Sequence, residues 1–284
     1  MPRAEVPGAT ISYEVQGDGE PLLLIPCLAA DSACWAFQLP EYAARYRCVV
    51  VDLPGSGGSP TPRGTPSTSR FADELAALLD LLEIDAAHVA GVSLGAAVAM
   101  QLAGRHPARV RTLALHSAWD VTDPFMRACI ETWRMLAQAL PTMADFVAAG
   151  VFPWAFTPEM YAGRPEVIRE FTEIVRARDA LWLDGFMAQS QAVLDHDASA
   201  VLGRIAAPTM VTYGARDVLT STRFAPALVI AIPDARLVVW DHLSHAGFNE
   251  DPAVFTADTL AFMDEAWSEG GGGTAHRPPR APSP

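Results

Sequence analysis

Five consecutive residues, Gly91-Val92-Ser93-Leu94-Gly95, form the pattern Gly-x-Ser-x-Gly and point most directly to chemistry. The run of residues 87–90 before them is typical of a strand, and residues 96–105 after them are typical of a helix. A serine on a tight turn between a strand and a helix presents an exposed hydroxyl, and small neighbours let the chain pass. The pattern therefore predicts that Ser93 is a nucleophile.

A serine hydroxyl is a weak nucleophile at neutral pH, so it needs a histidine base and an acid that orients the imidazole. Asp217 follows the strand pattern of residues 208–213, and His245 follows that of residues 235–240. The chain order Ser, Asp, His is the one expected after such a turn. Asp120 is the alternative acid, and His242 is the alternative base. Four other histidines are interpreted as structural or solvated: His88, His106, His116 and His196.

Composition narrows the classes of function. The chain has 284 residues, half of them hydrophobic, which fits one large α/β domain with a sizeable core. All 20 basic residues are Arg and none is Lys, which excludes Ser-Lys dyads and Schiff-base chemistry. A net charge of −13 opposes binding to nucleic acid or to anionic membranes, and favours a small neutral or apolar substrate.

Cysteine spacing and hydropathy bear on the compartment. The four cysteines have no CxxC spacing, which favours free thiols in a reducing compartment, and no metal site is indicated. No apolar run approaches the roughly 18 residues of a membrane span, and residues 1–5 lack the apolar core of a signal peptide. We therefore expect a cytoplasmic location and no membrane association.

The chain alternates between strand and helix patterns, which predicts an α/β fold with a mostly parallel sheet. Strand patterns occupy residues 10–15, 21–25, 48–52, 87–91, 110–117, 208–213 and 235–240, and helix patterns occupy 34–46, 67–82 and 252–267. Residues 120–197 show no strand pattern and are rich in aromatic residues, which indicates a helical lid. The expected organisation is a core of residues 1–119 and 198–268, a lid of residues 120–197, and a disordered tail of residues 269–284.

These motifs together resemble the α/β-hydrolases, most closely the group of enol-lactonases, esterases and cofactor-free haloperoxidases. The resemblance rests on residues 52–59 (Asp-Leu-Pro-Gly-Ser-Gly-Gly-Ser), the Ser93 turn, residues 214–217, and His245 followed by residues 250–252 (Glu-Asp-Pro). It implies a mostly parallel sheet flanked by helices, with a lid inserted after the sixth strand. It also implies that Ser93 is the nucleophile, Asp217 the acid and His245 the base. The family spacing from the base to residues 250–252 favours His245 over His242.

The resemblance also implies an oxyanion hole made of two backbone N–H groups. One would come from Leu94, and the other from Leu28 in the loop after Ile25. Many relatives begin this loop with His-Gly, whereas this chain has Pro26-Cys27-Leu28. Both Cys27 and Leu28 still carry an N–H group, so the oxyanion hole can form.

The expected function is a serine hydrolase that cleaves a small carboxylic ester or lactone through an acyl-enzyme on Ser93, with no cofactor. Epoxide hydrolases and haloalkane dehalogenases resemble this chain in fold, but both carry Asp at the position of Ser93. These two activities are therefore disfavoured. Thioesterase, acyltransferase or perhydrolase activity with the same three residues remains an alternative. A ligand receptor built on a hydrolase fold is the alternative from another class.

Overall fold

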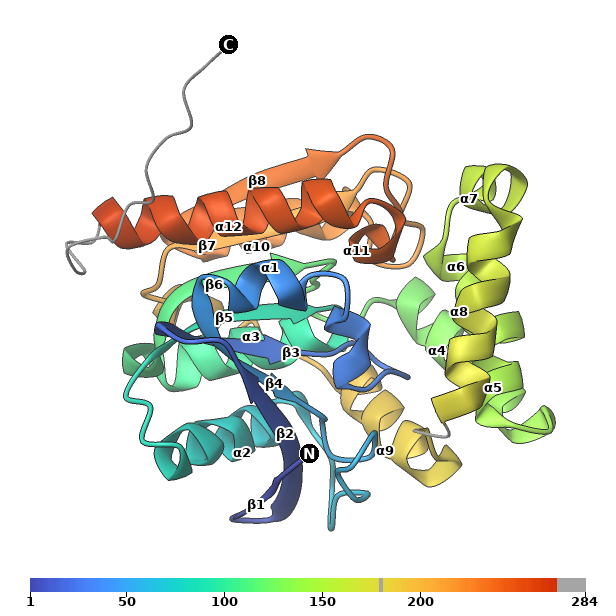
Figure 1. The fold of residues 1–284 in the computed structure, drawn as a ribbon, viewed down its shortest axis with the longest axis horizontal. Coiled ribbons are helices and arrows are strands. Elements are labelled where there is room, and N and C mark those ends of the chain that lie inside the picture. Colours follow the sequence, from blue (N-terminus) through green and yellow to red (C-terminus); the bar gives the residue numbers. More distant parts are fainter. Residues whose placement is uncertain (179–180, 270–284) are drawn as a thin grey trace.

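The computed structural model describes residues 1–178 and 181–269, whose strands form one eight-stranded sheet (Figure 1). Its order is β1-β2-β4-β3-β5-β6-β7-β8. Only the pairs β1/β2 and β2/β4 are antiparallel, and every other neighbouring pair is parallel. The predicted mostly parallel α/β sheet is therefore confirmed. The strands are β1 (Arg3–Val6), β2 (Ala9–Gln16), β3 (Glu20–Ile25), β4 (Tyr46–Val51), β5 (Ala87–Val92), β6 (Val110–His116), β7 (Thr209–Gly214) and β8 (Ala235–Trp240).

Helices cover both faces of this sheet, which is why β5 and β7 are buried along their whole length. The connection from β3 to β4 runs in one direction across the sheet, whereas those from β4 to β5 and from β5 to β6 run in the other. Right-handed crossovers therefore put α1 (Leu39–Ala43) on one face, and α2 (Thr68–Leu81) and α3 (Leu94–Arg105) on the opposite face. The last helix, α12 (Pro252–Glu269), packs against α1, and α10 (Ala225–Ala231) packs against β8.

The segment of residues 120–197, called the helical segment below, begins and ends at the same place in the fold. Val121 pairs with Asp197 in an isolated β-bridge, and the N–H of Ala198 donates to the carbonyl of Asp120. Helices α4 to α8 stand together beyond one end of the sheet (Figure 1). The division into core and lid at these residues stays a prediction. The helices are α4 (Pro124–Ala139), α5 (Met143–Phe146), α6 (Phe152–Ala155), α7 (Pro158–Gly163), α8 (Pro165–Arg178) and α9 (Leu183–Leu194).

Three local expectations differ from the structure. The helix predicted over residues 34–46 is instead a 3-10 turn (Ser32–Trp35) followed by α1, because Pro40 starts a separate helix. Strand β1 was not predicted; it pairs with β2 across a turn in which Gly8 has φ 93°. Glu269, which the prediction placed in the tail, ends α12, and residues 270–284 lie outside the described residues. No helix within the described ranges is long and apolar enough to cross a membrane.

Candidate active site

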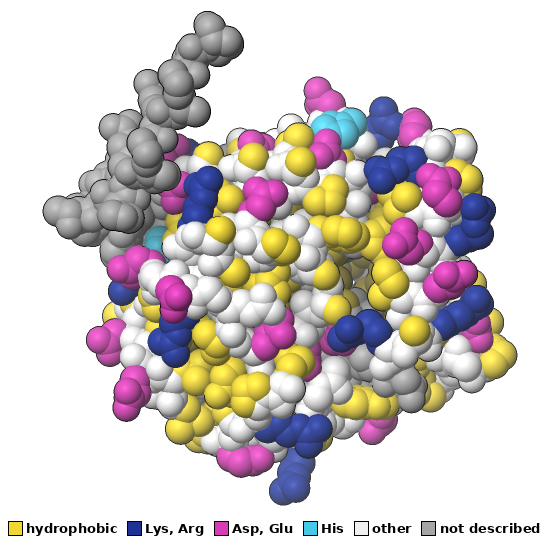
Figure 2. All heavy atoms as spheres, viewed as in Figure 1, with side chains coloured by type: hydrophobic (Ala, Val, Ile, Leu, Met, Phe, Trp, Pro, Cys, Tyr) yellow, Lys and Arg dark blue, Asp and Glu magenta, His cyan; other side chains and the backbone are white. Residues whose placement is uncertain are grey.

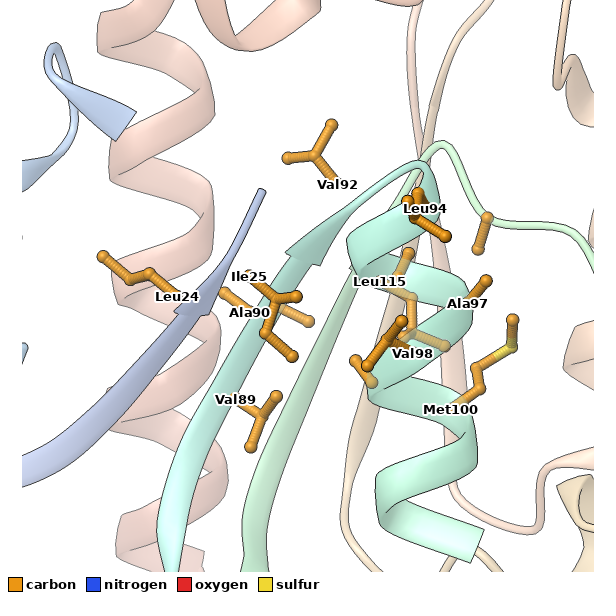
Figure 3. Close-up of a cluster of buried hydrophobic side chains, with 14 of the residues drawn as sticks. Leu24, Ile25, Val89, Ala90, Val92, Leu94, Ala97, Val98, Met100 and Leu115 are labelled. Atoms are coloured by element: carbon orange, nitrogen blue, oxygen red, sulfur yellow. The ribbon is translucent and has the colours of Figure 1, made fainter. Parts of the chain in front are cut away.

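Ser93 occupies the sharp turn between β5 and α3, as the sequence pattern predicts. Figure 3 shows the end of β5 and the start of α3, with Val92 and Leu94 labelled. Its backbone has φ 53° and ψ −115°, a region that non-glycine residues rarely adopt. The flanking glycines are required by close packing. A Cβ on Gly91 would lie 2.3 Å from the Gly95 carbonyl oxygen, and one on Gly95 would lie 2.2 Å from that of Ile25. The Gly-x-Ser-x-Gly pattern is thus needed to seat the turn against the end of β3.

Asp217 and His245 meet at the carboxyl ends of β7 and β8. His245 Nδ1 lies 2.8 Å from Asp217 Oδ2. The other carboxylate oxygen, Oδ1, accepts from the backbone N–H groups of Leu219 (2.7 Å) and Thr220 (3.0 Å). With Asp217 accepting from Nδ1–H, the imidazole is held in the tautomer whose Nε2 is free to accept a proton.

The charges of this pair reinforce each other. Burial raises the pKa of Asp217, but His245 and the hydrogen-bond donors around the carboxylate outweigh it, and the net pKa is lowered. Burial lowers the pKa of His245, whereas the Asp217 carboxylate raises it, and the net shift is upward. Asp217 therefore stays ionised at neutral pH, and it favours the imidazolium that forms when His245 takes a proton.

The alternative residues lie elsewhere. The side chain of His242 is more than half exposed, and its Nε2 lies 3.2 Å from Asp251 Oδ2. Its partner is therefore Asp251 and not Asp217. Among the hydrogen bonds of the described residues, none joins Asp120 to His245; the Asp120 carbonyl accepts from Ala198.

Four further histidines of the described residues have partners outside this site. His88, His116 and His196 are buried next to threonines, and His106 pairs with Asp73. Burial lowers the pKa of His88 and His196 to about 4 and that of His116 to about 3, so these three are neutral at pH 7.

Ser93 and His245 both line a cavity of about 330 Å³ between the sheet and the helical segment. Figure 2 shows a hollow there, rimmed largely by hydrophobic side chains. Trp133, Phe152 and Phe156 of the helical segment contribute aromatic walls. Trp133 Nε1 is buried and has no hydrogen-bond partner among the described residues. The size and the apolar lining are typical of a small-molecule site.

The loop after β3 closes one side of this cavity and carries Leu28, which lines it. Asp52 anchors the loop: its Oδ1 accepts from the N–H of Ser32 at 2.8 Å and its Oδ2 from that of Gly58 at 2.8 Å. This contact explains why the motif of residues 52–59 accompanies the Ser93 turn. Leu94 is the first residue of α3, where the N–H has no acceptor within the helix. Use of the Leu94 and Leu28 N–H groups as an oxyanion hole stays a prediction.

Cys27 and Cys34 lie together in the same cavity wall, and all four cysteines of the chain are free. A hydrogen bond from the Cys34 thiol lowers the pKa of Cys27, burial opposes the shift, and His245 adds to it. Burial raises the pKa of Cys34. Cys27 is therefore the more acidic thiol of the pair, and it lies next to the histidine of the site.

Sequence reasoning missed several residues that position this site. Thr220 donates to Asp217 Oδ2 at 2.7 Å, and its Oγ1 lies 3.1 Å from His245 Nδ1. Glu250 holds the His245 loop, because its Oε2 accepts from the Ser244 N–H and its Oε1 from the Thr157 N–H, each at 2.7 Å. Thr220 lies three residues after Asp217 on a turn, and this spacing could have predicted that its side chain bonds to the carboxylate. Glu250 belongs to the motif of residues 250–252, but its contact with Thr157 joins segments 93 residues apart and had no sequence signal.

In the part of the chain that the structure describes, no group of three or more His, Cys, Asp or Glu side chains is arranged to hold a metal ion. The arrangement that is present is a serine on a strained turn that lines the same cavity as a histidine paired with a buried carboxylate, and it suits acyl transfer.

Comparisons with known proteins agree with this geometry. Residues 20–162 match the model of the family described as having the alpha/beta hydrolase fold. A putative carbamate hydrolase RutD from Azorhizobium caulinodans is 28% identical over 93% of this chain and 99% of its own. The crystal structure of a hydrolase from Pseudomonas aeruginosa has 28% identity and a TM-score of 0.80, over 90% of this chain and 94% of its own. The crystal structure of an enol-lactonase from Burkholderia xenovorans has a TM-score of 0.81 and 24% identity, over 93% of this chain and 100% of its own. At this identity the likeness is one of fold.

Proposed function

Since this chain belongs to the α/β-hydrolase family and is a hydrolase, we propose that it cleaves a carboxylic ester or lactone through an acyl-enzyme on Ser93. The observation that carries the proposal is the 2.8 Å contact between His245 Nδ1 and Asp217 Oδ2 beside a serine on a strained turn. This arrangement supplies a base, an orienting acid and a nucleophile that lines the same apolar cavity as the base.

In the proposed mechanism, His245 Nε2 takes the proton of Ser93 while the hydroxyl oxygen attacks the substrate carbonyl. The negative oxygen that develops is bound by the backbone N–H groups of Leu94 and Leu28. Protonated His245, stabilised by Asp217, then gives its proton to the leaving alcohol, and the acyl group stays on Ser93. Water attacks this acyl-enzyme with His245 again as the base, which releases the acid.

A carbamate is the second candidate substrate, because a relative that matches 93% of this chain is named a putative carbamate hydrolase. The same three residues would attack a carbamate carbonyl. The mainly aliphatic and aromatic lining favours an ester with an apolar group instead, because a small polar carbamate would leave most of the cavity unfilled.

A fluorophosphonate probe and a substrate panel test the proposal together. We expect the probe to label the wild-type protein at Ser93 and to leave Ser93→Ala unlabelled. We also expect 4-nitrophenyl esters to be turned over faster than 4-nitrophenyl carbamates. Labelling at another residue, or turnover that persists in Ser93→Ala, would contradict the mechanism. Labelling of Ser93 with no turnover of any ester, thioester or carbamate would favour a ligand receptor.

A further inference from the structure

The polarity of the cavity wall bears on which substrates can enter. Among the described residues that line the cavity, Asp31 and Arg178 are the only members of the Asp, Glu, Lys and Arg types. The rest of the wall is largely aliphatic, aromatic or thiol-bearing. A charged group on a substrate would therefore have to find its partner at one of these two residues or remain unpaired in an apolar site.

Asp31 and Arg178 are already paired with each other. Arg178 donates to Asp31 Oδ2 from Nη2 at 2.6 Å and from Nε at 3.1 Å. The Asp31 side chain is 8% exposed and that of Arg178 is 45% exposed. The carboxylate is thus inside the wall, and the guanidinium caps it from the solvent side. The pair neutralises the only guanidinium that the described part of this wall offers to an incoming anion.

The pair joins two elements that both shape the cavity. Asp31 lies in the loop after β3, where its Oδ1 also accepts from the Ala33 N–H and caps the 3-10 turn. Arg178 is the last residue of α8, in the helical segment. On the same two elements, Phe37 packs edge-on against Phe171, with ring centroids 5.9 Å apart. Phe37 and Ile174 both line the cavity and are 49% and 43% exposed, so the rim beside the ion pair is apolar.

We propose that the Asp31–Arg178 ion pair determines which substrate charge the site accepts. The pair makes the site selective for neutral, apolar esters and excludes esters that carry a carboxylate. This inference rests on the proposed function and names its substrate class. Selectivity arises because Arg178 cannot serve a substrate carboxylate while Asp31 occupies it, and because the Asp31 carboxylate repels a second anion. Freeing Arg178 should therefore admit anionic substrates.

The test uses Asp31→Asn, which removes one charge and keeps the side-chain oxygen that caps the 3-10 turn. The matched control is Asp31→Asn/Arg178→Gln, which also loses the ion pair between loop and α8 but restores the balance of charge. A third variant, Arg178→Gln, leaves the Asp31 carboxylate alone in the wall. Any effect of loosening the helical segment is common to all three variants, so the double variant shows how much of a change in the substrate ratio comes from loosening alone.

The measured quantity is kcat/KM for an anionic ester divided by kcat/KM for a neutral ester of equal length. Suitable pairs carry the carboxylate on the acyl side, as in mono-4-nitrophenyl adipate against 4-nitrophenyl hexanoate. Others carry it on the alcohol side, as in phenyl acetate with and without a 4-carboxymethyl group. In the wild type we expect this ratio to be about 0.01 or lower, because an unpaired carboxylate is costly in an apolar site.

In Asp31→Asn we expect the ratio to rise by about 10- to 100-fold in at least one series, since a hydrogen bond between charged partners has that effect. The gain should shrink at high salt, because Arg178 is half exposed. The double variant should stay within about threefold of the wild type, and Arg178→Gln should not exceed it. The chain length with the largest gain would report the reach from Ser93 to Arg178.

Three results would overturn the inference. One is a wild-type ratio near 1, and another is an Asp31→Asn ratio within threefold of the wild type in both series. A third is an equal rise in Asp31→Asn and in the double variant, which would trace the gain to a loosened helical segment. Fluorophosphonate labelling of Ser93 in every variant separates these failures from a failure of the proposed function, in which neither labelling nor turnover of neutral esters occurs.

Discussion

Replacing Asp217 by Asn tests the role of the buried carboxylate with the smallest change in shape. The new amide keeps an oxygen for the N–H groups of Leu219 and Thr220, which bond to Oδ1 of Asp217 in the wild type. Its NH2 group would then face His245 Nδ1, which lies 2.8 Å from Oδ2 in the wild type. Because an amide NH2 only donates, Nδ1 must become the acceptor, and the proton moves to Nε2, the atom that should receive the proton of Ser93.

The expected loss follows from this tautomer. An imidazole held with Nε2–H cannot act as the base, and a change of this kind lowers kcat on the order of 10⁴-fold, which is about 5 kcal/mol of activation free energy. The pH profile should change as well. The Asp217 carboxylate raises the pKa of His245, and activity requires neutral His245, so the wild-type rate should fall as the pH drops through that raised value. In Asp217→Asn the carboxylate no longer raises the pKa of His245, so the fall in residual activity should begin at a lower pH.

The assay is kcat/KM on 4-nitrophenyl hexanoate from pH 5 to 9, with near-UV circular dichroism as a check on folding. Asp120→Asn is the matched control, because Asp120 is the other acid in a strand-end loop and contacts Ala198 through its backbone carbonyl, which the substitution keeps. Asp120→Asn should keep activity within about threefold. If Asp217→Asn stays within tenfold of the wild type while Asp120→Asn is inactive, the acid has been misassigned.

Two further predictions concern the cavity. Ser93→Ala and His245→Ala should each lower kcat by about 10⁴-fold or more while leaving the fold intact, since the residues act as a unit; retained activity in either would refute its role. Alkylation of Cys27, the more acidic of the two cavity thiols, should inactivate the wild type, whereas Cys27→Ser should keep most activity and resist the reagent; full activity with Cys27 shown by mass spectrometry to be alkylated would place it away from the oxyanion hole.

Local sequence was sufficient where short-range sterics or hydrophobic patterning decide the structure. The predicted strand cores match β2 to β8 closely, and the central parallel strands are continuous apolar runs because both of their faces are covered. Gly91 and Gly95 are required by contacts with the turn itself and with β3, which makes Ser93 recognisable from its neighbours. The short helix α1 was predicted too long because the pattern ignored Pro40, which lies in its first turn.

The tertiary structure decided how distant side chains meet. The contact between His245 and Asp217, and the exclusion of His242 from it, depend on how the loops after β7 and β8 fold toward each other. Asp31 and Arg178 are 147 residues apart and leave no periodic signal, because neither position is fixed by its own helix or strand pattern. Sequence patterns record what a segment buries along its own length. The charge of the cavity wall depends instead on which side chains two separate elements bring within hydrogen-bond distance, and only their packing determines that.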